Sequence, residues 1–132
     1  MMTKSYIDLH MHSMYSDDGE YTPTQLVDMC HETGVKIMAI ADHNWVKANE
    51  EAKKHADELG MTYIPAIEID CTYKGVNLHV LGYGIDNQEV FNQLGADIEK
   101  QEIACSMKKL ELTNALGFDL KKEQLDALST NG

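Results

Sequence analysis

The segment that says most about the architecture is Lys36-Ile37-Met38-Ala39-Ile40-Ala41-Asp42-His43-Asn44. After Lys36 it is continuously apolar up to Ala41, a pattern typical of a strand that is covered on both faces. The run then ends at a carboxylate and an imidazole. Because α/β proteins place their sites at the carboxyl ends of parallel strands, the segment predicts an α/β fold with Asp42 and His43 near a site.

The flanking sequence alternates between strand and helix patterns. Strands are expected at 6–9, 36–41 and 61–67, a hairpin at 70–81, and helices from Pro23 to Gly34 and at 46–59, 89–116 and 121–128. The first of these helices has the clearest start, because Thr22 can cap it, Pro23 suits its first position and Gln25 completes a capping box. Alternation of this kind implies βαβ units with parallel strands.

Length and composition limit the classes of protein. The chain has 132 residues, which suits a single domain, and its 43% hydrophobic and 25% charged residues argue against disorder. Eleven lysines, no arginine and 22 acidic residues give a net charge of −11. This balance argues against nucleic-acid binding through a broad basic surface, but it leaves open a nucleotide held locally by metal ions.

The three cysteines, Cys30, Cys71 and Cys105, are widely spaced and form no CxxC pair, so neither a zinc knuckle nor a redox motif is predicted. They fit a reducing, cytoplasmic setting, and each is expected to be a small buried hydrophobic residue. We expect no signal peptide and no membrane contact, because no run approaches the roughly 20 apolar residues of a membrane span.

Histidines and acids follow several of the expected strands. The positions are His10 and His12 after the first strand, Asp17 in the next loop, Asp42 and His43 after the second, Glu68 and Asp70 after the third, and His79 in the hairpin. His10 and His12 are two residues apart on an extended chain, so both imidazoles can point to one side and reach one cation. Mixed imidazole and carboxylate ligands suit Zn, Mn or Fe.

Each of these positions also has a simpler explanation. A lone HxH is weak evidence, Asp42-His43 could be a helix-capping turn, Glu68 an exposed acid and His79 a solvent-facing residue. Their joint placement at strand ends nevertheless predicts a metal site, in which a carboxylate such as Glu68 can bridge two cations about 3.5–4 Å apart. His31 and His55 lie within expected helices and are predicted to be surface or structural residues.

These motifs resemble the polymerase-and-histidinol-phosphatase (PHP) family of metal-dependent phosphoesterases, its small stand-alone branch in particular. The matching segments, in the family's order and spacing, are Asp8-Leu9-His10-Met11-His12-Ser13, Ser16-Asp17, Thr22-Pro23, Ala41-Asp42-His43-Asn44, Ile64-Pro65-Ala66-Ile67-Glu68-Ile69 and Leu78-His79-Val80-Leu81-Gly82-Tyr83-Gly84. The resemblance covers roughly residues 6–86.

The resemblance implies a distorted, seven-stranded (β/α) TIM-like barrel that holds up to three divalent metal ions. It implies that His10 and His12 bind one metal, that Glu68 bridges to a second bound by His79, and that Asp17 and His43 bind a third. Asp17 is favoured for the last role, with Asp18 as the alternative. The implied activity is hydrolysis of phosphomonoesters or nucleotide phosphodiesters by a metal-bound hydroxide, with no catalytic side chain assigned.

The family barrel is about twice as long as this chain, and no histidine follows His79. Residues 1–132 are therefore expected to be one truncated PHP domain, about its N-terminal half, with a second copy or partner chain as a means of closing the barrel. Two alternatives stay open. One is an inactive metal-binding half-barrel that acts as an assembly or regulatory module, and the other is hydrolysis of amides or esters.

Overall fold

The computed structural model describes residues 5–128. They form two compact units, and the boundary along the chain lies between Leu94 and Gly95. The elements in chain order are β1 (Ile7–Met11), α1 (Pro23–Thr33), β2 (Ile37–Ile40), α2 (Ala48–Glu58), β3 (Thr62–Tyr63), β4 (Ala66–Tyr73), β5 (Val76–Tyr83), α3 (Gln88–Ala115) and α4 (Lys122–Asp126). No helix within 5–128 has the length and apolar character needed to cross a membrane.

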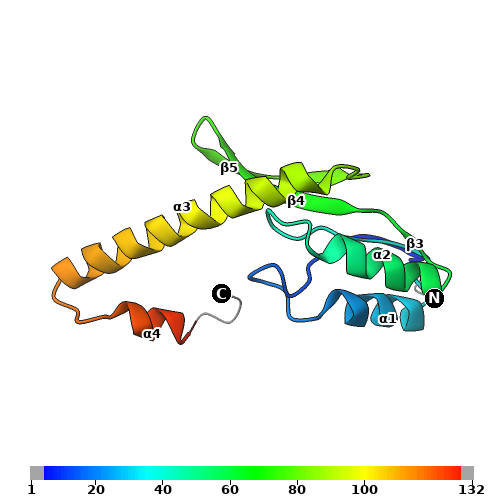
Figure 1. Ribbon diagram of the computed structural model, residues 1–132, viewed down its shortest axis with the longest axis horizontal. Helices are drawn as coiled ribbons and strands as arrows, with labels where there is room; N and C mark the ends of the chain where they lie inside the picture. The colour runs from blue at the N-terminus through cyan, green and yellow to red at the C-terminus, as the bar shows by residue number, and fades with distance from the viewer. Residues whose placement is uncertain (1–4, 129–132) are drawn as a thin grey trace. The chain divides into compact units, whose positions relative to one another are not determined.

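The first unit is built on a parallel sheet of β1, β2 and β3, in which β2 is central. Met38 and Ile40 of β2 point into a core with α1 and α2, which lie side by side (Figure 1). Ala39 and Ala41 point the other way, toward Ala66 and Leu9. Residues 38–41 are at most 1% exposed, so the prediction of a strand covered on both faces is confirmed.

Helix α1 begins and ends as the sequence predicts. The Thr22 side chain accepts a hydrogen bond from the Gln25 N–H (3.2 Å), and the Gln25 side chain accepts one from the Thr22 N–H (2.9 Å). Gly34 ends the helix in the left-handed region with φ of 93°, where the absence of a Cβ removes the steric cost. These caps fix where the chain turns back toward β2.

The predicted third strand, 61–67, is wrong in its extent. Only Thr62 and Tyr63 pair with β2, and the chain changes direction at Pro65, which has no N–H to donate to a sheet. The buried Asn49 of α2 holds this kink. Its amide donates to the Ala66 C=O (2.9 Å) and accepts hydrogen bonds from the Ala66 N–H (3.0 Å) and the Tyr63 hydroxyl (2.8 Å).

Glu68 therefore lies inside β4 and not after a strand end. At this point β4 runs beside the residues that follow β2: the Glu68 N–H donates to the Asp42 C=O (3.0 Å), and the Asn44 N–H donates to the Glu68 C=O (2.7 Å). Over its whole length β4 also pairs antiparallel with β5, and a two-residue turn at Lys74 and Gly75, both at positive φ, joins the two strands. The predicted hairpin is confirmed and is longer than expected.

The outer part of this hairpin is open to solvent. Every residue from Cys71 to Leu81 is exposed, including the thiol-bearing Cys71, and no further strand lies beside β5 among the described residues. The prediction of three buried cysteines is therefore correct for Cys30 and wrong for Cys71 and Cys105. Cys71 lies in the hairpin and Cys105 in α3, and most residues around them in these elements are exposed to solvent.

The second unit contains most of α3 and the short α4. The predicted helices at 89–116 and 121–128 are confirmed with shifts of a few residues at their ends. Gly117 follows α3 at φ of 99°, and the Asn114 amide then bridges the connection by exchanging two hydrogen bonds with the backbone of Leu120. Apolar residues such as Ile103 and Met107 are exposed on α3.

We predict that Asn49→Ala lowers the free energy of unfolding by about 3 kcal/mol, because three buried hydrogen-bonding groups lose their partner. Urea unfolding of the full protein measures this. Glu50→Ala, an exposed change one residue along α2, is the matched control. A loss below about 0.5 kcal/mol, the range of ordinary surface changes, would contradict the assigned role of Asn49.

Candidate metal centre

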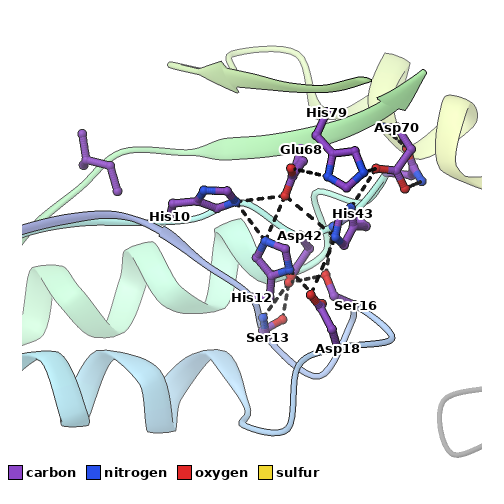
Figure 2. Close-up of polar contacts among 12 residues, drawn as sticks. His10, His12, Ser13, Ser16, Asp18, Asp42, His43, Glu68, Asp70 and His79 are labelled. Carbon is purple, nitrogen blue, oxygen red and sulfur yellow. Dashed lines mark hydrogen bonds and ion pairs between the residues drawn. The ribbon is translucent and has the colours of Figure 1, made fainter. Parts of the chain in front are cut away.

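Five of the six ligands expected from the sequence meet in the first unit. His10 comes from β1, His12 and His43 from the segments after β1 and β2, Glu68 from β4 and His79 from β5, and their rings and carboxylate face one another (Figure 2). A β-bulge between Asp8 and Met11 inserts an extra residue into β1 opposite β2. Bulges of this kind redirect side chains near sites, and this one lies at His10.

The tightest group consists of His10, His12 and Glu68. The two Nε2 atoms are 3.1 Å apart, and each lies close to Glu68 Oε2, at 2.9 Å for His10 and 3.0 Å for His12. Ligand atoms bound at about 2.1 Å to one cation are about 3.0–3.4 Å apart, so this triangle has the dimensions of a coordination site. Two facing imidazole nitrogens share at most one good hydrogen bond, whereas a cation between them satisfies both lone pairs.

Glu68 is the centre of the arrangement. The residue is only 3% exposed, and its second oxygen, Oε1, lies 2.9 Å from His79 Nδ1. Burial alone would raise the pKa of the Glu68 carboxyl, but hydrogen bonds from His10 and His79 and the charge of His43 outweigh it and lower that pKa. The carboxylate is therefore ionised at neutral pH and available to bridge two cations.

A second group forms around the loop after β1. Asp18 Oδ1 lies 2.8 Å from His12 Nδ1, and Asp18 Oδ2 lies 3.8 Å from His43 Nε2. Burial would raise the pKa of Asp18, but the hydrogen bond and charge of His12 and the charge of His43 lower it. Asp17, which the sequence favoured, is exposed and belongs to none of the candidate ligand groups among the described residues, so the structure brings the alternative, Asp18, to the centre.

The loop that carries Asp18 is closed by short backbone hydrogen bonds. The Ser16 N–H donates to the Ser13 C=O (2.9 Å), and the Gly19 N–H donates to the Ser16 C=O (3.2 Å). A Cβ on Gly19 would lie 1.9 Å from the Ser13 carbonyl oxygen, so only glycine fits at this crossing. Gly19 thus fixes the position of the neighbouring Asp18.

Asp42 holds this loop through hydrogen bonds and is not itself in a candidate ligand group. Its carboxylate is buried and accepts hydrogen bonds from the Ser13 N–H (2.6 Å), the Ser13 hydroxyl (2.7 Å) and the Ser16 hydroxyl (3.0 Å). The Ser16 hydroxyl in turn accepts the N–H of His43 (2.9 Å). Burial raises the pKa of Asp42 despite these hydrogen bonds.

Asp70 follows the third strand expected from the sequence but is not among the ligands expected there, and the structure brings it into the cluster. It lies two residues after Glu68, on the same face of β4, and its Oδ1 is 2.9 Å from His43 Nδ1 and 3.5 Å from His79 Nε2. Burial would lower the pKa of His43, but Asp70, followed by Glu68 and Asp18, raises it. The period-two spacing of Glu68 and Asp70 was the available signal, since alternate strand residues share a face.

The cluster thus contains three overlapping sets of ligand atoms that fit a metal ion, namely His10, His12 and Glu68; His12, Asp18 and His43; and His43, Asp70 and His79. Residues 8–124 match the PHP domain. The chain belongs to the PHP domain family.

Curated relatives of this PHP protein include a nuclease and a phosphatase. A 5'-3' exoribonuclease of Haemophilus influenzae is 32% identical over 115 residues, which cover 87% of this chain and 40% of the relative. A 3',5'-nucleoside bisphosphate phosphatase of Chromobacterium violaceum is 32% identical over 83 residues, which cover 63% of this chain and 29% of the relative. The chain therefore spans well under half the length of these relatives.

Solved structures show the same partial correspondence. An amidohydrolase from Chromobacterium violaceum, solved with sulfate and without metal, has a TM-score of 0.75 at 26% identity over 88% of this chain and 41% of its own. A Bifidobacterium adolescentis chain assigned as a metal-dependent phosphoesterase has a TM-score of 0.77 at 25% identity over 96% of this chain and 44% of its own. The α/β class and the parallel sheet are thereby confirmed.

We predict that Gly19→Ala weakens divalent-metal binding by about 10-fold or more, because the loop must move and carry Asp18 away from His12 and His43. Calorimetric titration of the metal-stripped protein with Mn²⁺ measures the affinity, and circular dichroism checks that the fold is kept. Glu20→Ala, an exposed change in the same loop, serves as the control. Unchanged affinity in Gly19→Ala would show that the loop does not position a ligand.

Proposed function

We propose that this protein is a divalent-metal-dependent phosphoesterase that hydrolyses phosphomonoesters or nucleotide phosphodiesters. The observation that carries the proposal is the buried Glu68 carboxylate, whose two oxygens face His10 and His12 on one side and His79 on the other. Carboxylates that can bridge two cations, with imidazoles completing each site, are the donor set of two-metal hydrolases.

In this proposal His10, His12, Glu68, His79 and His43 hold up to three ions of Mn, Zn or Fe, and Asp18, in place of Asp17, is the acidic ligand beside His43. Such ions supply Lewis-acid charge that polarises a phosphate and acidifies water. The chain's own residues keep the ions in place and leave one side open, because the His10 and His79 side chains are about half exposed. A phosphate can approach from that side.

The charge distribution supports an anionic substrate that is captured by the ions. Residues 1–90 carry 15 acidic residues against 6 lysines, so phosphate has few cationic side chains to bind near the cluster. Bound cations reverse the sign of the local potential and lower the repulsion among the acids. The relatives act on RNA and on a nucleoside bisphosphate, and nucleotides or short nucleic acids are accordingly the proposed substrates.

A closed barrel is also part of the proposal. Along β5 the side chains of Val76, Leu78 and Val80 are exposed, and within the described residues the outer edge of that strand has no partner. Open apolar edges tend to pair with other chains. Further polypeptide from the same chain, a second copy or a partner chain would cover this edge, complete the barrel and add metal ligands.

A second candidate is a metal-binding module without catalytic activity. It is favoured by the three sets of donor atoms, which can hold metal ions whether or not a substrate is converted. Amide hydrolysis is a third, because one related structure is described as an amidohydrolase. The three candidates differ in what the metal-loaded protein converts.

The test is hydrolysis by the full protein loaded with Mn²⁺, measured as phosphate release from p-nitrophenyl phosphate and a nucleoside 3',5'-bisphosphate, and as nucleotide release from a short RNA. We predict hydrolysis of at least one of these substrates. His12→Ala and Glu68→Gln should each lower kcat/KM by more than about 100-fold, because each variant removes a side chain proposed to bind the metal directly. His31→Ala, an exposed change on α1, is the control.

Stoichiometric metal without hydrolysis of any phosphate ester would contradict the phosphoesterase and favour the inactive module. Hydrolysis of an acyl-amide substrate alone would favour the amidohydrolase. A chain that binds no divalent metal would contradict all three.

A further inference from the structure

We propose that Asp70 is a positioning residue, which fixes the ring orientation and the tautomer of His43 so that His43 Nε2 is its metal-binding nitrogen. This inference rests on the proposed metal centre and adds to it a carboxylate that is not one of its ligands. It depends on the geometry around one imidazole and on how Asp70 is itself held.

The two nitrogens of His43 face different partners (Figure 2). Nδ1 lies 2.9 Å from Asp70 Oδ1, a hydrogen-bond distance, whereas Nε2 lies 3.8 Å from both Asp18 Oδ2 and Glu68 Oε2. A proton on Nδ1 that is donated to Asp70 leaves the lone pair on Nε2. The gap on the Nε2 side is too long for a direct hydrogen bond and suits ligand atoms that share a cation.

Asp70 is held by Asn44, the residue that follows His43. The Asn44 side chain donates to Asp70 Oδ2 (3.0 Å) and accepts a hydrogen bond from the Asp70 N–H (3.0 Å), so one amide holds both the carboxylate and the backbone of Asp70. Asn44 is buried and has φ of 60°, a left-handed conformation that asparagine tolerates better than most residues. The Asn44 N–H also donates to the Glu68 C=O (2.7 Å), which ties this arrangement to β4.

The chain thus contains a carboxylate–histidine pair, Asp70 and His43, in which His43 Nε2 faces the proposed metal centre. Metal-bound histidines generally donate their other ring N–H to a carboxylate or carbonyl, which sets the tautomer and makes the bound nitrogen more basic. Asp70 occupies that position for His43. One of its oxygens lies 2.9 Å from His43 Nδ1 and 3.5 Å from His79 Nε2, and the other accepts a hydrogen bond from Asn44, so protein groups already surround the carboxylate.

The competing role is direct ligation of a third ion by Asp70, His43 and His79, whose atoms also lie close enough together. That role would require His43 to bind through Nδ1, the nitrogen that already contacts Asp70 at 2.9 Å. His43 would then turn its protonated Nε2 toward the site shared with Asp18. The two roles predict different tautomers and different numbers of bound ions.

The experiment compares wild-type full protein with Asp70→Ala and Asp70→Asn, and uses Zn²⁺ as the probe. Zinc per chain at saturation is measured by mass spectrometry, affinity by competition with a chelating dye, and the His43 tautomer by ¹⁵N-edited NMR, with and without zinc at pH 9. Asp86→Ala, which removes an exposed carboxylate elsewhere in the first unit, is the matched control.

We predict an Nδ1–H tautomer for His43 in the wild type, with or without zinc, and its loss in Asp70→Ala. Zinc affinity should fall by about 10- to 100-fold in Asp70→Ala, the range for a group that hydrogen-bonds a metal-bound histidine, with zinc per chain unchanged. Asp70→Asn should lose less, since its amide oxygen still accepts a hydrogen bond. A double variant, Asn44→Asp with Asp70→Asn, restores the paired hydrogen bonds and should recover the tautomer.

An Nε2–H tautomer in the wild type would overturn the proposal, as would one zinc fewer per chain in both Asp70→Ala and Asp70→Asn, which would identify a direct ligand. Unchanged affinity and tautomer in Asp70→Ala would also overturn it. If the wild-type chain bound no zinc, the proposed function would fail, whereas the zinc-free tautomer would still decide whether Asp70 orients His43.

Discussion

The site depends on one constraint, which is that the buried carboxylate of Glu68 must be paired. A charged group that is almost fully removed from water is strongly destabilising unless opposite charges or hydrogen-bond donors surround it. Glu68 meets this requirement with three imidazoles from two separate parts of the chain, His10 and His12 at β1 and His79 on β5. The same requirement brings these residues to distances that suit a shared cation.

Buried polar residues outside the candidate ligand groups hold the surrounding loops. Asp42 fixes the loop after β1, Asn49 fixes the kink before β4, and Asn44 fixes Asp70. In the part of the chain that the structure describes, every buried side-chain nitrogen and oxygen has a hydrogen-bond partner. A fully paired network of this kind is rigid, and rigidity is what a metal centre needs if its ligands are to be placed before the ion arrives.

The sequence predicted the elements of the fold that depend on local signals. The cap at Thr22, the apolar strand before Asp42 and the hairpin turn at Lys74 are set by neighbouring residues, and they appear where expected. The break at Pro65, the choice of Asp18 over Asp17 and the contact of Asp70 with His43 depend on residues far apart in the chain. Periodicity and spacing carry little information on such contacts, because tertiary packing decides them.

The central claim is that Glu68 Oε2, His10 Nε2 and His12 Nε2 bind one cation. The most direct measurement is an anomalous difference map from crystals of the full protein grown with Mn²⁺. The account predicts a peak about 2.0–2.2 Å from all three atoms. A fully occupied manganese ion elsewhere, with Glu68 bound only to protonated histidines, would contradict it.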